Sequence, residues 1–485
     1  MSVALEKLEP ALLWERFFEL TRIARPSKAE GPAREHVLAW AAARSLAARA
    51  DAEGNVVVGI PASPGRESAP VVVLQAHLDI VCERDPDSPF DPREGRIDVR
   101  VEDDWVRANG TTLGADNGIG VAAALAVADD DAVQHGPLEL VFTVSEEQGL
   151  DGAKALDDSL VTGRLLVNLD GTSDAALTIG CAGSDHTLLR MKLPEEPLAA
   201  GTVVRHVELS GAKGGHSGGD IAAGRLNAVK ALGRVLAAAY EAAPFALVSF
   251  DGGVSRNAIP RDARTLACVP AGLEDSFRRA AEAELAAIVR QHAGNDDGLV
   301  LDISPAKAAT AASAAATRRA LDLVSAIPTG VVAITPGLVE VVETSTSLTT
   351  ATTESGVLTL GSMTRSSNAA ALDAGLATMH ALARLGGAEI EARRSYPPWE
   401  PDLDSELLAA ARATHTRVFG ADPALTVVHG GLECAVLGQR LPGVQMISTG
   451  PEIVGPHAPG EKVRISSTQR FYLLLGSLLD DLSRA

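Results

Sequence analysis

Short apolar segments of strand length, separated in places by helical stretches, are the feature that most constrains the fold of this chain. They are rich in β-branched residues, as buried strands are, and occupy residues 56–60, 71–76, 138–144 and 165–169. A helix is predicted between two of them, at 118–128. Such alternation is typical of a layered α/β sheet. The same pattern returns near the C-terminus, at 405–418, 425–428, 444–448 and 466–482.

Residues 186–394 have a different pattern, in which strand-like segments lie among long alanine-rich helices. Helices are predicted at 222–242, 273–292 and 305–327, with strands at 203–210, 357–363 and 388–392. This segment is long enough to be a domain. We therefore predict a catalytic α/β domain with a mixed central sheet, formed by 1–185 and 395–485, which is interrupted by an inserted α+β lid domain at 186–394.

Composition excludes several classes of function. The 485 residues carry a formal net charge of −20, which repels phosphate backbones and anionic lipids, so neither nucleic acid nor a membrane surface is an expected partner. The four cysteines, at 82, 181, 268 and 434, form no close pair and favour a reducing cytoplasm. Residues 1–15 lack the basic and apolar order of a signal peptide.

His77 and Asp79 follow the predicted strand at 71–76. Residues two apart in a strand face the same way, and a carboxylate often orients the imidazole of a metal ligand. The alternative for this pair alone is a surface histidine near an aspartate. Asp170 likewise ends the segment 165–169, and His457 lies in a turn rich in proline and glycine.

Two further acidic clusters have the same ambiguity. Asp116 lies in a glycine-spaced turn that opens a helix, where it is either a ligand or an ordinary helix cap. Glu146 and Glu147 follow the strand at 138–144. If both carboxylates are buried, they need a cation beside them, whereas in a solvated loop water stabilises their charge.

Taken together, these residues are more informative. The acids and His77 fall at the carboxyl ends of predicted strands, where ligands gather in open α/β sheets. Two histidines and three carboxylates suit a pair of divalent cations, zinc above all, with cobalt or manganese as alternatives. Three carboxylates and a hydroxide would also balance two such cations.

An ordered series of motifs extends over nearly the whole chain and comprises His77-Leu78-Asp79, TTLGADNGIG at 111–120, Glu146-Glu147, Asn168-Leu169-Asp170, GCAG at 180–183, KGGHSGGD at 213–220, SRNAIPR at 255–261, GGLEC at 430–434 and GPHAPGEKV at 455–463. Together these motifs resemble those of the carnosinase-like aminoacyl-histidine dipeptidase branch of the M20 metallopeptidases. Departures occur at 171–173, where further acids are usual, and at Ala435, where glycine is usual; they bear on substrate preference more than on catalysis.

The resemblance implies a role for each matching residue. Asp116 would bridge two metal ions, His77 and Asp170 would complete one site, and Glu147 and His457 the other. Further roles fall to residues that bind no metal: Glu146 as general base, Asp79 as the residue that orients His77, His216 as a lid histidine that reaches over the site, and Arg256, Asn257 and Arg365 as substrate-binding residues. Without the resemblance, His216 would more readily be a loop histidine that caps a helix.

The expected reaction is the hydrolysis of Xaa-His dipeptides, of the β-alanyl-histidine type, by a metal-activated water with Glu146 as general base. A broader di- or tripeptidase and an N-acyl amino-acid deacylase are alternatives on the same scaffold. The alternative from another class is a non-catalytic metal- or ligand-binding protein. The presence of Glu146 argues against it, because this carboxylate is not an expected metal ligand and a binding protein would have no need of it. His216 would act in its own chain or from the partner in a homodimer, and both arrangements stay open.

Overall fold

The computed structural model describes residues 8–484, and it divides into two compact units. Unit 1 contains the chain up to Cys181, Pro401–Val427 and the chain from Leu432 onward, and unit 2 contains Ala182–Glu400 and Val428–Gly431. The predicted class, an α/β domain with an inserted α+β domain, is confirmed. That the insert is a lid stays a prediction. Part of the 1–15 segment lies outside the described residues.

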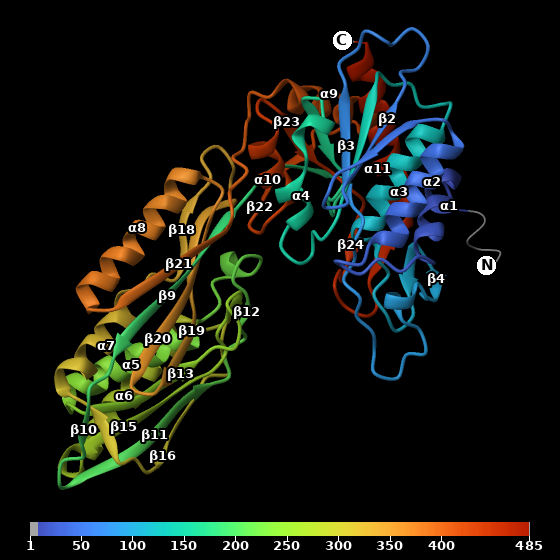
Figure 1. The fold of residues 1–485 in the computed structure, drawn as a ribbon. Coiled ribbons are helices and arrows are strands. Elements are labelled where there is room, and N and C mark those ends of the chain that lie inside the picture. Colours follow the sequence, from blue (N-terminus) through green and yellow to red (C-terminus); the bar gives the residue numbers. More distant parts are fainter. Residues whose placement is uncertain (1–7, 485) are drawn as a thin grey trace. The chain divides into compact units, whose positions relative to one another are not determined.

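Unit 1 is built on a mixed eight-stranded sheet with the order β1-β2-β6-β3-β7-β23-β8-β22 (Figure 1). Its central strands β6, β3, β7 and β23 are parallel neighbours, and their buried residues explain the continuous apolar runs in the sequence. The strands are β1 Ala47–Ala50, β2 Val56–Ile60, β3 Val72–His77, β6 Leu138–Thr143, β7 Leu165–Asn168, β8 Ala176–Cys181, β22 Ala424–Val428 and β23 Gln445–Ser448.

Helices cover both faces of this sheet (Figure 1). On one face α3 contacts β3, β6 and α1; on the other, α10 contacts α4, β8 and β23. Helix α3 is buried along almost its whole length because its side chains are small and apolar. The helices of unit 1 are α1 Ala11–Leu20, α2 Gly31–Ala43, α3 Ala115–Asp129, α4 Asp151–Ala155, α9 Glu406–Phe419, α10 Glu433–Arg440 and α11 Ile465–Ser483.

A small second sheet in unit 1 brings the C-terminal segment against an early part of the chain. Its strand order is β24-β25-β5-β4, where the strands are β4 Val99–Glu102, β5 Trp105–Ala108, β24 Ile453–Val454 and β25 Lys462–Arg464. The antiparallel pairing of β25 with β5 holds the segment 455–461, which includes His457, beside the segment that leads into α3.

Unit 2 contains a nine-stranded sheet with the order β16-β11-β15-β13-β19-β20-β9-β21, and β18 also pairs with β19. Its strands are β9 Gly183–Lys192, β11 Thr202–Ser210, β13 Ala246–Gly252, β15 Ala263–Pro270, β16 Val300–Pro305, β18 Gly330–Ile334, β19 Val342–Glu354, β20 Val357–Ser366 and β21 Glu389–Tyr396. Two short pairs lie outside this sheet: β10 Glu195–Pro197 with β17 Thr310–Ala312, and β12 Gly215–His216 with β14 Ala258–Ile259.

Four helices pack against the sheet of unit 2: α5 Ala228–Ala242, α6 Glu274–Gln291, α7 Ala314–Ala326 and α8 Ala369–Gly386. Their apolar side chains share one core with the sheet, in which Leu232, Phe277, Val324 and Met379 are buried with Leu360 of β20. This core explains the alanine-rich helices of the insert, because small side chains allow helices to approach a sheet closely.

Several predicted helix boundaries are wrong. The helix predicted at 305–327 begins only at Ala314, because Pro305 ends β16 and the Ser313 side chain accepts a hydrogen bond from the Ala316 amide as an N-cap. The helix predicted at 222–242 begins at Ala228 behind the Asn227 cap. The helical periodicity at 32–48 likewise predicts a single helix, but α2 ends at Ala43 and β1 follows.

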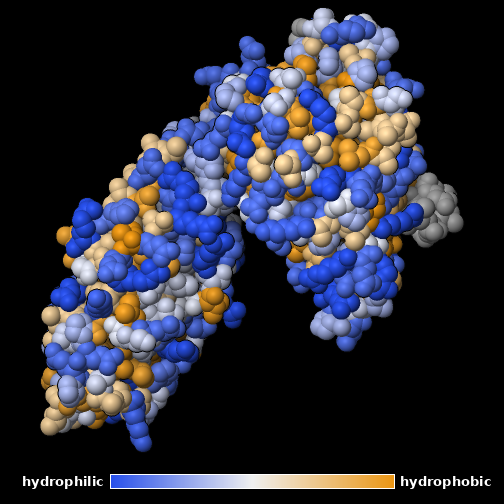
Figure 2. Space-filling view, viewed as in Figure 1, coloured by the Kyte–Doolittle hydropathy of each residue, from blue (hydrophilic) through white to orange (hydrophobic). Residues whose placement is uncertain are grey.

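On the visible face of both units, hydrophilic residues surround scattered hydrophobic ones (Figure 2). None of the helices within residues 8–484 is long and apolar enough to cross a bilayer.

Candidate metal centre and active site

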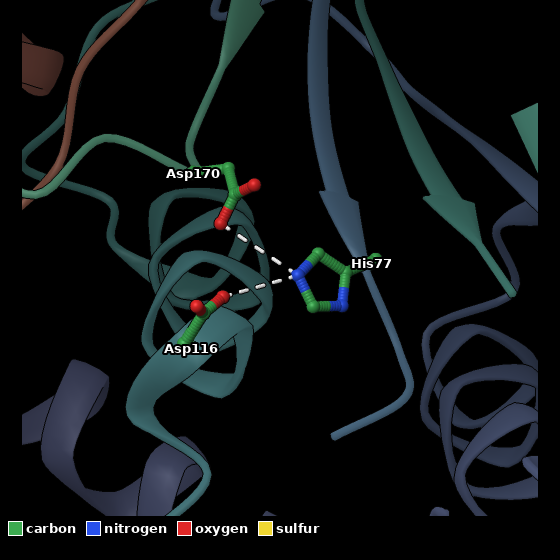
Figure 3. Close-up of side chains that lie close together, drawn as sticks. All are labelled: His77, Asp116 and Asp170. Carbon is green, nitrogen blue, oxygen red and sulfur yellow. Dashed lines mark hydrogen bonds and ion pairs between the residues drawn. The ribbon is translucent and has the colours of Figure 1, made fainter. Parts of the chain in front are cut away.

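His77 is the last residue of β3 and is buried, with a side-chain exposure of 1%. Its Nε2 atom lies 3.2 Å from Oδ1 of Asp116 and 3.6 Å from Oδ1 of Asp170 (Figure 3). Its Nδ1 atom lies 3.1 Å from the backbone oxygen of Asp79 and 3.5 Å from its Oδ1. One ring nitrogen is therefore oriented by Asp79, and the other points toward two carboxylates.

Asp116, in the first turn of α3, faces both predicted histidines. While its Oδ1 lies near His77, its Oδ2 lies 3.3 Å from Nε2 of His457. The same His457 atom is 3.0 Å from Oε1 of Glu147. Asp116 thus has one oxygen for each of two adjoining groups, the arrangement that a bridging ligand needs.

Three overlapping groups of ligand atoms result, each with all its atoms within 4.8 Å of one another. The groups are His77 with Asp116 and Asp170, His77 with Glu146 and Glu147, and Asp116 with Glu147 and His457. The five predicted metal ligands and the predicted base therefore lie together in unit 1, although they come from segments far apart in the sequence.

Asp79 also organises the loop that carries Glu146 and Glu147. Its Oδ1 accepts a hydrogen bond from the Glu146 amide at 3.0 Å, and its Oδ2 accepts one from the Glu147 amide at 3.2 Å and one from Ser27 Oγ at 2.7 Å. Burial acts to raise the pKa of Asp79, but hydrogen bonds from His77 and these donors lower it to about 2. Asp79 is therefore an ionised anchor for the two glutamates as well as for His77.

The cluster carries more negative charge than its own side chains can stabilise. Burial, together with the charge of Asp116, raises the pKa of Asp170 to about 8. Burial also raises the pKa of Glu146, with contributions from Asp170 and Glu147. Hydrogen bonds with Asp116 and Glu147 raise the pKa of His457 to about 10. Without cations, protons would have to neutralise these carboxylates.

This donor set fits two divalent cations. Each group offers three imidazole or carboxylate atoms, and three protein ligands with a fourth, exchangeable position are typical of catalytic zinc sites. Positive charge between the carboxylates would replace the protons that their close approach otherwise requires. The donor types fit manganese and cobalt as well as zinc.

A buried polar network supports the centre from inside the sheet. Glu433 of α10 accepts hydrogen bonds from Gln75 and Thr143, and Asn168 donates to Gln75. The Asn168 side-chain oxygen in turn accepts from the Asp170 amide at 3.2 Å. Burial raises the pKa of Glu433 to about 7. Glu433 of the GGLEC motif thus supports the strands that lead to the candidate ligands, and among the described residues it belongs to none of the three ligand groups.

The glycines of the 111–120 block make room for a buried arginine. Arg25 donates hydrogen bonds to the backbone oxygens of Leu78, at 3.0 Å, and Gly114, at 2.7 Å. A Cβ atom would lie 2.4 Å from Arg25 Nη2 at Gly118 and 2.8 Å from it at Gly114. The close approach that these two glycines allow is therefore an approach to Arg25, which the sequence analysis did not single out.

The remaining predicted site residues lie in unit 2, where His216 is close to the 255–261 motif. His216 pairs with Ala258 through β12 and β14, and Asn257 accepts a backbone hydrogen bond from Ser217 at 2.8 Å. The His216 side chain accepts hydrogen bonds from the Gly218 and Gly219 amides. His216, Arg256 and Asn257 are all exposed.

Arg365 has different surroundings from Arg256, because it is only 5% exposed. Its Nη1 donates to Tyr396 Oη at 3.0 Å, whereas its buried Nε has no hydrogen-bond partner. Burial and the charge of Arg365 lower the pKa of His429 to about 4, and Nε2 of His429 lies 2.7 Å from Ser345 Oγ. The sequence analysis did not single out His429 or Tyr396. The position of His429 directly before the GGLEC motif could have indicated it.

The family model for Peptidase family M20/M25/M40 matches residues 73–481, which include all five predicted metal ligands. The chain belongs to peptidase family M20. The resemblance inferred from the ordered motifs is therefore confirmed.

Relatives of this M20 chain match it from end to end. The cytosol non-specific dipeptidase of Escherichia coli (strain K12) is 36% identical over 479 residues, 99% of each chain. The crystal structure of aminoacylhistidine dipeptidase from Vibrio alginolyticus has a TM-score of 0.92 at 35% identity, and the match covers 98% of this chain and 97% of that one. The aminopeptidase PepT of Bacillus cereus, at 15% identity, has a TM-score of 0.57 and covers 98% and 99%; it shares the fold.

Proposed function

We propose that this M20 enzyme hydrolyses dipeptides at the carboxylate–histidine cluster of unit 1, and that Xaa-His dipeptides of the β-alanyl-histidine type are its substrates. The observation that carries the proposal is the position of Asp116, whose two oxygens face His77 and His457 at 3.2 and 3.3 Å. This arrangement supports a two-metal centre with Asp116 as the bridge, Asp170 on the His77 side and Glu147 on the His457 side.

Two divalent ions, when bound, would polarise the scissile carbonyl and lower the pKa of a water molecule. Glu146 is held beside the centre through its backbone amide by Asp79. It is in place to take the proton of the attacking water on its carboxylate and to pass it to the leaving amine. His77 keeps Nε2 directed at the centre because Asp79 holds Nδ1.

We extend the proposal to the substrate's carboxylate, which Arg365 is suited to bind. Its buried Nε has no hydrogen-bond partner, and a guanidinium binds both oxygens of a carboxylate. Arg256 and Asn257 stay candidates for binding the peptide, and His216 for donating a hydrogen bond to the developing oxyanion. Whether His216 acts in its own chain or across a homodimer is part of the same proposal, as is the role of 186–394 as a lid.

Broad dipeptidase activity is the second candidate. It is favoured by the E. coli relative, which is a non-specific dipeptidase by name, whereas the Vibrio relative is named for aminoacylhistidine substrates. The two candidates share one chemistry and differ only in which C-terminal residues are accepted. A cytoplasmic location is proposed for either, supported by the cytosolic relative.

Assays on metal-reconstituted protein test the proposal. Metal-stripped protein is loaded with zinc, cobalt or manganese and given β-alanyl-histidine, other Xaa-His dipeptides, dipeptides that end in other residues, tripeptides and N-acetyl amino acids. We expect kcat/KM to be higher for Xaa-His dipeptides than for the other compounds of the panel, and we expect chelation of the metal to abolish activity. Equal kcat/KM across C-terminal residues would replace the Xaa-His proposal with broad specificity, and full activity in the metal-free protein would overturn both.

A further inference from the structure

Glu461 is a buried carboxylate that lies next to the metal centre but belongs to none of its three ligand groups. Its two oxygens accept hydrogen bonds from four consecutive backbone amides. Oε2 accepts from Leu113 at 2.7 Å and Gly114 at 2.9 Å, and Oε1 accepts from Ala115 at 2.8 Å and Asp116 at 3.2 Å. Each oxygen thus binds two donors, which is the full acceptor capacity of an ionised carboxylate.

These four bonds connect two segments that carry metal ligands. Glu461 follows His457 by four residues, and the last of the four amides belongs to Asp116. A backbone hydrogen bond from Gly460 to the Thr111 oxygen, at 3.0 Å, joins the same two segments. The separation of Asp116 Oδ2 and His457 Nε2, 3.3 Å, therefore depends on a junction in which Glu461 makes most of the bonds.

We propose that Glu461 is a positioning residue for the metal centre, and that it fixes Asp116 and His457 at the separation that lets both bind the same cation. The proposal rests on the proposed two-metal function. Its role is distinct from that of a ligand, because Glu461 acts on the backbone of Asp116 and leaves both Asp116 oxygens directed at the histidines.

A purely structural role is the alternative, since the amides at the start of a helix need acceptors in any protein. The two roles predict different measurements. A structural acceptor contributes to the stability of the fold, and its loss lowers stability without a selective effect on the metal. A positioning residue also sets metal affinity, and changes beside a ligand typically lower affinity by about 10- to 100-fold.

Glu139 provides a matched control in the same unit. It is buried, and it accepts hydrogen bonds from the Thr162 amide at 2.9 Å, the Gly163 amide at 3.0 Å and the Thr162 hydroxyl at 2.7 Å. It lies near the start of β6, whereas Glu146 and Glu147 follow the end of that strand. Glu139→Gln therefore removes comparable hydrogen bonds without touching the segments that carry metal ligands.

The experiment titrates metal-stripped full-length protein with zinc by calorimetry and with cobalt by visible absorption. In Glu461→Gln, the new side-chain NH₂ would face two amide donors, so two of the four bonds are lost. We expect Glu139→Gln to bind two ions, each with the same affinity as in the wild-type chain. In Glu461→Gln, affinity for one of the two should fall by about 10- to 100-fold, with a changed cobalt spectrum. Glu461→Asp keeps the charge on a shorter side chain and should recover part of the affinity.

Two results would overturn the positioning role: unchanged affinity of Glu461→Gln for both ions, or an equal loss of affinity in Glu139→Gln. Circular dichroism of the metal-free variants reports folding, and if Glu461→Gln does not fold, Glu461→Asp decides, since wild-type affinity in that variant would also overturn the role. Dipeptide turnover by the wild-type protein is measured separately. Its absence would overturn the proposed function, whereas the affinities of the variants decide the role of Glu461.

Discussion

Glu146 and Glu147 are adjacent in the chain, yet their surroundings give them different tasks. The Glu147 side chain lies 3.0 Å from His457, where it can share a cation with that residue and Asp116. Glu146 belongs to a ligand group with His77, but the proposed two-metal centre takes its ligands from the two histidines and from Asp116, Glu147 and Asp170. In that proposal Glu146 is free to move a proton.

Replacing Glu146 separates catalysis from metal binding. We expect Glu146→Gln to bind two ions per chain, as the wild type does, while kcat falls by about 100- to 10,000-fold, because an amide cannot take a proton from water. Metal content is measured by elemental analysis and turnover by release of the C-terminal amino acid. The companion variant Glu147→Gln should lose both turnover and bound metal, because Glu147 is a proposed metal ligand. Wild-type kcat in Glu146→Gln would show that another group is the base.

At the scale of elements, packing and capping decided boundaries that periodicity alone placed wrongly. The start of α7 is set by Ser313, and its end is held by a side chain from another helix. Lys230 of α5 donates from Nζ to the backbone oxygens of Val324 at 2.8 Å, Ser325 at 2.6 Å and Ile327 at 2.6 Å. The last carbonyls of a helix have no partner within it, and a positive charge there is favourable.

Lys230→Met should therefore loosen the end of α7 while keeping the side-chain length. We expect the free energy of unfolding to fall by about 1–3 kcal/mol, since acceptors of a charged donor lose their partner. Faster hydrogen exchange should be confined to the amides near Ile327. Lys307→Met, at an exposed lysine of the same unit, serves as control and should change stability by less than about 0.5 kcal/mol. Equal effects of the two variants would contradict this role of Lys230.

At the scale of the whole molecule, stability depends on pH through opposing contributions. The formal net charge of −20 decreases in magnitude as the pH falls toward the pI of about 5.0, which reduces self-repulsion. Protonation of buried histidines acts in the opposite direction. In unit 2, burial and the charge of Arg365 lower the pKa of His429 to about 4, so the folded chain keeps this side chain neutral where the unfolded chain protonates it.

Between the unfolded pKa of about 6.5 and the folded value of about 4, the unfolded state binds more protons at His429. The contribution of His429 to stability is therefore lost as the pH falls through this window, by at most about 3 kcal/mol. We expect His429→Gln to lose less stability than the wild type between pH 7 and pH 5 in thermal unfolding. Parallel curves for the two proteins, or an NMR titration of His429 near pH 6.5, would contradict the assigned direction.

The sequence by itself determined the α/β class, the inserted domain and which candidate ligands lie together, because those properties depend on strand-length apolar segments and on polar residues at their ends. It also predicted the family, through motifs whose order is preserved from His77 to His457. The helix starts predicted near 222 and 305 were wrong. Periodicity in an alanine-rich segment does not show where a helix begins, and the start is set by a capping residue such as Asn227 or Ser313, whose side chain accepts a hydrogen bond from a backbone amide of the first turn.

Only the tertiary structure decided how the ligands and their supports meet. The two oxygens of Asp116 face histidines separated by most of the chain, and the residues that hold this arrangement, Arg25 and Glu461, act on backbone atoms. Side-chain patterns in a sequence record which groups are present, but a hydrogen bond to a backbone amide or carbonyl far away in the chain, unlike a local helix cap, leaves no pattern at the position that supplies it. Such contacts exist only once β25 has paired with β5 and α3 has packed against β3.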